Sequence, residues 1–149
     1  MRAVVTRVRS ACVTRAQNGE LLGKIGKGYL VLLGVHTDDT EKEADKIADK
    51  IVGLRVFEDE NGKMNLSAAA VGAEILIVSQ FTLWADCRSR RPGFTRAARP
   101  DTAIPLYERV IAQCRAQGFR VETGEFGADM LVDSVNDGPV TILLDTTEL

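Results

Sequence analysis

Residues 134–145, SVNDGPVTILLD, contain an interruption that limits what this chain can fold into. Val140–Leu144 is typical of a buried β-strand, and residues 132–135 before the interruption are nearly as apolar. Between them lies Asn-Asp-Gly-Pro. Proline cannot donate a hydrogen bond to a neighbouring strand, and glycine has no side chain to pack. A core strand that carries Gly138-Pro139 must interrupt its hydrogen bonds to the neighbouring strand at this point. The interruption therefore calls for a structural or functional reason.

Much of the remaining chain is predicted to form strands. Segments 2–8, 28–35 and 73–86 are apolar or alternate between apolar and polar residues, and the chain after residue 119 returns to this pattern. Asn18-Gly19 separates two extended pieces, which indicates a β-hairpin because both central residues of that turn need positive φ.

Two helices are marked by their ends. Thr40 and Glu43 fit a capping box ahead of apolar residues at helical spacing. The second helix is expected from about Asp101 to Gln117, with Pro105 in its first turn and Gly118 as the stop signal. Strands outnumber helices, so the sequence predicts a layered protein in which α and β are mixed. For 149 residues, one domain over 1–149 is the natural expectation.

The usual catalytic and metal-binding sets are missing. The one histidine, His36, is expected to be a loop residue before a helix cap, and the three cysteines are far apart without a CxxC motif. Acidic residues 58–60 fall in a turn beside Asn61-Gly62, where their side chains are expected to keep the turn in contact with water. Neither a metal nor a cofactor is therefore expected. If the protein is an enzyme, backbone groups, hydroxyls or the substrate itself must carry the chemistry.

The composition gives little indication of a partner. A net charge of −2 and a pI near 5.5 provide no global attraction to nucleic acid, so any such site must be a local patch. No signal peptide and no apolar run of membrane-spanning length are visible, which predicts a cytoplasmic protein.

Two segments stand out as candidate sites. Ser79–Thr82, SQFT, places hydroxyls and an amide at the end of a buried strand, although composition alone fits a strand that simply leaves the core. Residues 88–99, RSRRPGFTRAAR, hold five arginines, one phenylalanine and no acid. Arginines with an aromatic among them suit phosphate contact and base stacking, whereas the alternative is a solvated loop.

The chain resembles the D-aminoacyl-tRNA deacylases, called D-Tyr-tRNA deacylases in older naming. SQFTL and NDGPVT are the two signature motifs of that family, and both are intact. The resemblance runs nearly end to end and also covers IGKGYLVLLGV, LRVFEDENGKMNLS, RRPGFT, PLYERV and VETGEFGADM. Departures are minor: Trp84 stands where tyrosine is usual, Cys87 where threonine is expected, and Ser89 breaks a frequent Lys-Gly pair.

The resemblance implies a reason for the interruption at Gly138-Pro139. The family fold is a compact, sheet-rich, layered α/β/β domain with two main helices, and it forms a homodimer. The Gly138–Pro139 bond would be cis, which costs X-Pro only about 0.5–1 kcal/mol. The dipeptide of one subunit would enter the pocket of the other, where its carbonyl groups form a chiral wall, and glycine lets the backbone come close to a ligand. Arg7 would brace this turn.

The implied reaction is hydrolysis of the ester that joins a D-amino acid to the 3′-terminal adenosine of tRNA. The L side chain would collide with the Gly-Pro wall, and achiral glycine is a plausible second substrate. The ribose 2′-hydroxyl would orient or activate water, while the protein supplies position and an oxyanion site. No cofactor is implied.

Site residues carry over from the family one at a time. Ser79, Gln80, Phe81 and Thr82 would line the pocket, with Ser79, Gln80 and Thr82 near the ester as the catalytic set, and Met130 would pack on the adenine. Thr82 as nucleophile is the less favoured alternative because no neighbouring base is visible. Acceptor-stem phosphates would be contacted by the five arginines of the loop, Arg88, Arg90, Arg91, Arg96 and Arg99.

Two other functions remain open from the sequence. A non-catalytic RNA-binding module would use the same arginine loop but leave the aminoacyl group in place. A sibling editing enzyme with a trans Gly-Pro bond would remove L-alanine, although Arg7 suits the cis form.

Overall fold

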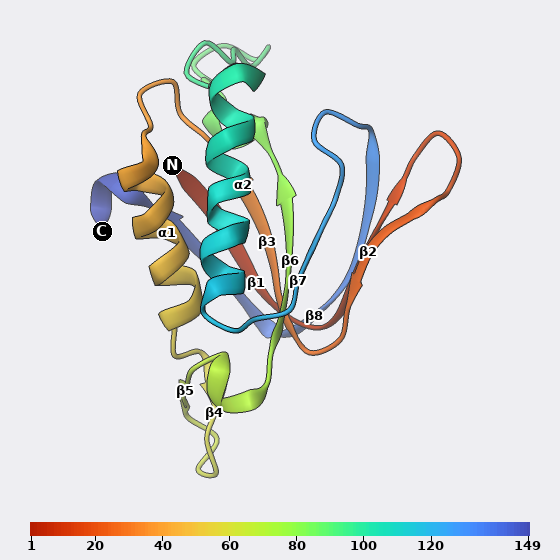
Figure 1. Cartoon of the computed structure of the whole chain (residues 1–149), viewed down its shortest axis with the longest axis vertical. Coiled ribbons are helices and arrows are strands. Elements are labelled where there is room, and N and C mark those ends of the chain that lie inside the picture. Colours follow the sequence, from red (N-terminus) through yellow and green to blue (C-terminus); the bar gives the residue numbers. More distant parts are fainter.

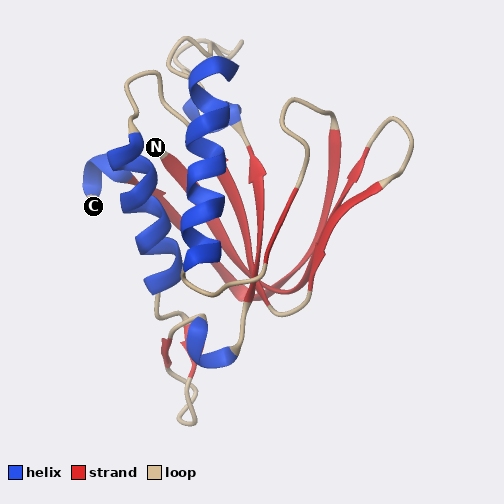
Figure 2. Ribbon diagram, viewed as in Figure 1, coloured by secondary structure: helices blue, strands red, loops and turns tan.

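A computed structural model describes all residues, 1–149, as a mixed α/β fold in which both helices cover one face of a curved sheet (Figures 1 and 2). The sheet has the strand order β2-β1-β3-β6-β7, and β8 pairs with the other edge of β1. Its strands are β1 (Arg2–Arg15), β2 (Leu21–Ile25), β3 (Gly28–Gly34), β6 (Glu74–Ser79), β7 (Val121–Thr123) and β8 (Met130–Asp145). A separate ribbon pairs β4 (Phe57–Glu58) with β5 (Met64–Leu66).

The helices α1 (Glu41–Gly53) and α2 (Pro100–Ala116) confirm the two predicted helices. The predicted capping box is present, because Thr40 and Glu43 exchange hydrogen bonds at the start of α1. One detail was wrong. The helix α2 begins at Pro100, because the fixed φ of proline suits the first helical position. Pro105 therefore lies beyond the first turn and not within it. Neither α1 nor α2 has the length and apolar composition of a membrane-spanning helix.

The sheet separates two cores, which gives the predicted layering. On β3 and β6, Tyr29, Val31 and Ile77 belong to the core shared with the helices. Their alternate neighbours Leu30 and Val78 belong to a second core on the opposite face, because successive side chains of a strand point to opposite faces. The distal half of β1 and the end of β2 cover this second core.

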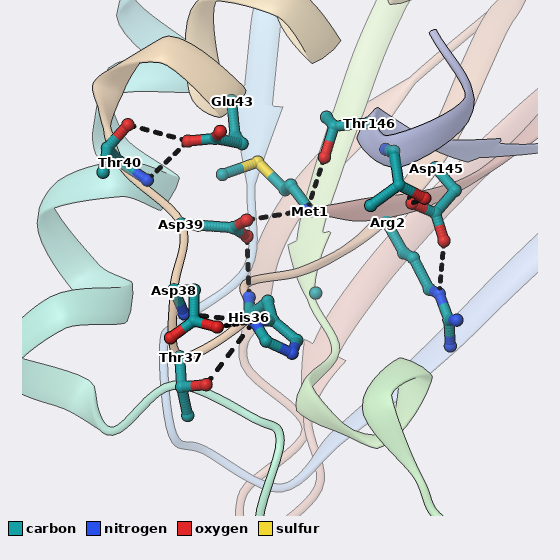
Figure 3. A network of polar contacts seen from close by, with 12 residues as sticks. Met1, Arg2, His36, Thr37, Asp38, Asp39, Thr40, Glu43, Asp145 and Thr146 are labelled. Atoms are coloured by element: carbon teal, nitrogen blue, oxygen red, sulfur yellow. Dashed lines mark hydrogen bonds and ion pairs between the residues drawn. The ribbon is translucent and has the colours of Figure 1, made fainter.

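A polar network joins the ends of three segments that are distant in sequence (Figure 3). The amino group of Met1 donates to the Asp39 carboxylate at 2.9 Å and to the Thr146 hydroxyl at 2.8 Å. The same Asp39 carboxylate accepts from the His36 backbone N–H at 2.7 Å. The network therefore fixes the start of β1 against the loop after β3 and the end of β8.

Candidate active site at the end of strand β6

The SQFT segment begins where β6 stops. The last ladder bond runs from the Gln80 N–H to the Leu33 carbonyl at 2.8 Å, and Phe81–Trp84 then form a 3-10 helix. The predicted strand 73–86 is therefore wrong beyond Ser79. The apolar residues after Ser79 pack in a helical turn, and an apolar run alone does not distinguish the two structures.

Trp84 fastens this turn to the sheet. Its indole N–H donates to the Gly34 carbonyl at 3.0 Å. A Cβ at Gly34 would lie 2.8 Å from the Gln80 carbonyl oxygen, so only glycine permits this approach. The guanidinium of Arg2 lies over the indole ring at 4.0 Å and also donates to the Leu83 carbonyl. These contacts hold the SQFT backbone in one place.

His36 takes part in the same packing, which the sequence did not reveal. Its ring meets the Trp84 ring edge-on, with centroids 4.5 Å apart. It lies in the loop before α1 as predicted, but it is a packing residue there and does not line the cavity beside the SQFT segment.

A cavity of about 320 Å³ lies beside the SQFT segment. Ser79, Gln80 and Phe81 line it, and so does Met130 at the start of β8. Most of the other lining residues are apolar and come from β3, α2 and the loop before β8. An apolar cavity with a few polar groups from one segment is the usual form of a small-molecule site.

The loop before β8 is shaped by Met130. The Met130 sulfur accepts a hydrogen bond from the Glu125 N–H at 3.4 Å, and a Cβ on Gly124 would lie 2.6 Å from the same sulfur. Because Gly124 has no side chain, it leaves room for Met130, which was predicted to pack on the adenine.

The cavity has few groups that could transfer a proton. Among its lining residues only Tyr107 and Asp129 titrate. The Tyr107 hydroxyl already donates to the Ile77 carbonyl at 2.9 Å, and burial raises the pKa of this phenol to about 12. Asp129 is exposed on the loop and was not singled out from the sequence. Histidine and cysteine do not line the cavity, and the chain has no cluster of three or more His, Cys, Asp or Glu side chains that could hold a metal ion.

Thr82 lies next to the cavity without lining it. Its hydroxyl accepts a hydrogen bond of 2.5 Å from the Gln80 side-chain amide. The N–H groups of Phe81 and Thr82 are the first of the 3-10 helix and have no partner within it. Hydroxyl, amide and free N–H groups are therefore concentrated in one exposed turn at the mouth of the cavity.

Gly138 and Pro139 lie elsewhere in the chain's own fold. In the β1–β8 ladder Thr6 pairs with Thr141 and Val8 pairs with Asn136, so four residues of β8, 137–140, stand opposite Arg7 alone. The peptide bond between Gly138 and Pro139 is cis, and both residues are exposed. Neither lines the cavity of its own chain.

Arg7 fixes this bulge by hydrogen bonds to two backbone carbonyls. Although it is charged, it is only 5% exposed. It donates to the Asp137 carbonyl at 3.0 Å and to the Val56 carbonyl at 2.6 Å. The side chain of Asn136 closes the neck of the bulge by accepting from the Val140 N–H at 3.1 Å. One buried guanidinium thus connects the bulge to the segment before β4.

The arginine loop is anchored at both ends. Asp86 and Gly93 exchange two backbone hydrogen bonds of 2.7 and 2.9 Å. Arg88 forms a forked pair with the Asp86 carboxylate, which lowers the pKa of that acid to about 2. Arg96 donates to the Ala85 carbonyl at 3.0 Å. The remaining arginines of the loop make no ion pair, and these are Arg90, Arg91 and Arg99.

Comparison with known proteins gives a consistent result. The family model described as D-Tyr-tRNA(Tyr) deacylase matches residues 4–145. A D-aminoacyl-tRNA deacylase of Symbiobacterium thermophilum is 58% identical over 147 residues, which cover 98% of this chain and 96% of that protein. One of Clostridioides difficile strain 630 is 55% identical over 149 residues and 99% of each chain.

Solved structures agree with the fold. A structure titled c-Myc DNA Unwinding Element Binding Protein superposes with a TM-score of 0.90 and 44% identity over 97% of this chain and 98% of that one. A probable eukaryotic D-amino acid tRNA deacylase superposes with a TM-score of 0.84 over 96% and 97% of the two chains, at 17% identity. The second match shows a shared fold alone.

Proposed function

This chain belongs to the D-Tyr-tRNA(Tyr) deacylase family, and we propose that it proofreads chirality by hydrolysing D-aminoacyl-tRNA in the cavity beside the SQFT segment. Membership makes the chain a D-aminoacyl-tRNA deacylase, which is a hydrolase of carboxylic esters. The observation that carries the rest of the proposal is the open turn Ser79–Thr82 at the mouth of an apolar cavity. Because its substrate is aminoacyl-tRNA, the enzyme would work in the cytoplasm.

The cavity would hold the 3′-terminal adenosine, with Met130 and Phe81 packing on the adenosine and the ester lying beside Ser79, Gln80 and Thr82. Attack of water on the ester carbonyl builds negative charge on its oxygen. The N–H groups of Phe81 and Thr82, together with the Thr82 hydroxyl, are donors that could stabilise this charge. Collapse of the intermediate breaks the ester C–O bond and releases the amino acid and tRNA.

The ribose 2′-hydroxyl of the substrate would position or activate the water. A protein base is not required for this route, which fits a cavity whose lining holds only a high-pKa phenol and an exposed carboxylate. Thr82 as a nucleophile needs a group to take its proton, and its one side-chain partner, the Gln80 amide, is itself a donor. Substrate-assisted hydrolysis is therefore the preferred mechanism.

Rejection of L-amino acids would come from the Gly138–Pro139 bulge of a second subunit. Within one chain the bulge is exposed and does not line the cavity, so on this proposal it would act in the cavity of the other subunit. The same strand offers apolar side chains for a homodimer contact, since three large ones of β8 are exposed and do not line the cavity: Leu131, Val135 and Leu143. Apolar patches of this kind are typical of protein interfaces. Glycine has no side chain to reject and would be a second substrate.

Acceptor-stem phosphates would bind the arginine loop. Arg90, Arg91 and Arg99 have free guanidinium groups for this role. Arg88 and Arg96 would contribute charge from their anchored positions, since both remain exposed. This patch is the local positive charge that an acidic protein needs to bind RNA.

The test is hydrolysis of matched D- and L-tyrosyl-tRNA by the purified protein. We expect release of D-tyrosine and an essentially intact L-ester. Binding without release would indicate an RNA-binding module instead. Preferential release of L-alanine from L-alanyl-tRNA would indicate the sibling editing activity.

A further inference from the structure

Two exposed aromatic rings lie together beside the cavity. Phe81 is 56% exposed and Phe94 is 37% exposed. Their ring centroids are 5.1 Å apart and the planes meet at 74°, an edge-to-face pair. Large apolar side chains that are exposed next to one another often mark an interaction site.

The pair connects two sites that the sequence separates. Phe81 lines the cavity, whereas Phe94 belongs to the arginine loop. The two backbone bonds between Asp86 and Gly93 turn the loop back on itself, and Phe94 follows directly after that closure. The Phe94 carbonyl then accepts from the Ala97 N–H at 3.1 Å. The position of Phe94 beside Phe81 is therefore fixed by backbone contacts of the loop.

The charge around the pair limits what can bind there. The segment 88–99 contains five arginines and no acid. Arg90 and Arg91 have no carboxylate partner. Aromatic rings next to free guanidinium groups suit a single-stranded nucleic acid, whose bases stack while its phosphates pair with the arginines. An acidic or apolar protein partner would leave one half of this surface unused.

We propose that Phe94 forms a stacking platform for the unpaired base of the tRNA 3′ end just before the esterified adenosine, and that the edge-to-face Phe81 ring holds Phe94 beside the cavity. This inference rests on the proposed function, because the adenosine must first occupy the cavity that Phe81 lines. The 3′ end of tRNA is single-stranded, so its bases are free to leave one another and stack on protein rings. The platform joins recognition of the ester to recognition of the stem phosphates.

Phe94 is the residue to test, since Phe81 belongs to the segment around the ester. Two substrates separate the roles: D-tyrosyl-tRNA and 3′-O-D-tyrosyl-adenosine, which lacks every nucleotide before the terminal one. For each variant the readout is the ratio of kcat/KM on tRNA to kcat/KM on the adenosine ester. The matched control is Leu21→Ala, an exposed apolar residue at the start of β2.

Phe94→Ala should lower this ratio roughly 5- to 150-fold, the loss expected for one base–aromatic stack. The loss should lie in KM. Phe94→Tyr and Phe94→Trp should restore most of the ratio because each keeps a π-face, and Leu21→Ala should keep the wild-type ratio. The dependence of tRNA binding on salt should keep its slope in Phe94→Ala, since stacking releases no counterions.

Three results would overturn the platform while the wild type stays active. One is an unchanged ratio in Phe94→Ala. Another is an equal loss on both substrates, which would make Phe94 a support for the cavity alone. The third is dissociation of Phe94→Ala into monomers by sedimentation, which would make the pair a subunit contact. A wild type that hydrolyses neither substrate would overturn the proposed function itself.

Discussion

Replacing Arg7 with methionine tests whether the Arg7 guanidinium supports the Gly138–Pro139 bulge. Methionine keeps the length of the aliphatic stem and removes the guanidinium. The Val56 and Asp137 carbonyl groups then lose donors at 2.6 and 3.0 Å. Each buried acceptor left without a partner costs about 1–3 kcal/mol.

Part of this loss is recovered, because the wild-type protein also bears the cost of keeping a charged guanidinium out of water. A net decrease of about 2–4 kcal/mol in the free energy of unfolding follows from these two effects. For a chain of this size the melting temperature should fall by roughly 4–16 °C. Because Arg7 holds the bulge, the ratio of D- to L-tyrosyl-tRNA hydrolysis should fall as well.

Arg9→Met is the matched control on the same strand. Arg9 is 76% exposed and meets the Asp137 carboxylate only at 3.7 Å, so its removal should change stability by no more than about 0.5 kcal/mol. Urea unfolding of both variants measures the difference, and the deacylation assay measures the D to L ratio. If Arg7→Met is no less stable than Arg9→Met, the two carbonyl contacts do not hold the bulge.

Three further predictions concern the chemistry, the RNA and acid stability. Thr82→Ala should slow turnover about 10²–10³-fold with near-normal tRNA binding, as for a lost oxyanion donor; a dead variant that occurs alongside normal cleavage of a 2′-deoxy substrate would identify Thr82 as the nucleophile. Replacing Arg90 and Arg91 with alanine should lower the slope of log binding constant against log salt by roughly 0.7–0.9 for each lost contact, as measured by filter binding. The pKa of Asp145 lies at about 2 in the folded protein: burial alone would raise it, but the hydrogen bonds from Arg2 and Thr147 outweigh burial. Because that folded pKa is depressed from 3.8, its stabilisation is present above pH 3.8 and is lost as pH falls towards 2, so Asp145→Asn should lose less stability than wild type over that window in urea titrations.

The features that the sequence predicts best are those that depend on residues close to one another in the chain. The capping box at Thr40 and the helix stop near Gly118 depend on neighbours three or four residues away, and both helices form where expected. The strand expected to run through residue 86 ended at Ser79 instead. Trp84 decides that ending by reaching the Gly34 carbonyl, 50 residues earlier in the chain, and a local apolar pattern does not contain that contact.

The candidate site divides in the same way. Its SQFT and GEFGADM segments carry residues whose roles the family resemblance can transfer, and Ser79, Gln80, Phe81 and Met130 do meet at one cavity. The partners of Arg7 could not be predicted, because Val56 and Asp137 contribute backbone carbonyls that every residue type possesses. The same holds for the arginines, which look alike in the sequence although Arg88 and Arg96 are engaged in holding the loop.

This difference has a physical consequence for a site that uses backbone groups. On the proposed reaction, the ester would meet N–H groups of one subunit and carbonyl groups of another, and no substitution other than proline removes such a group. Substitutions would then change the selectivity chiefly at the side chains that hold these backbone groups in place. Arg7 holds the bulge and Trp84 holds the SQFT turn, and each acts through a hydrogen bond to a carbonyl distant in sequence. Variants at these two positions should therefore impair selectivity or rate without removing any group that contacts the substrate.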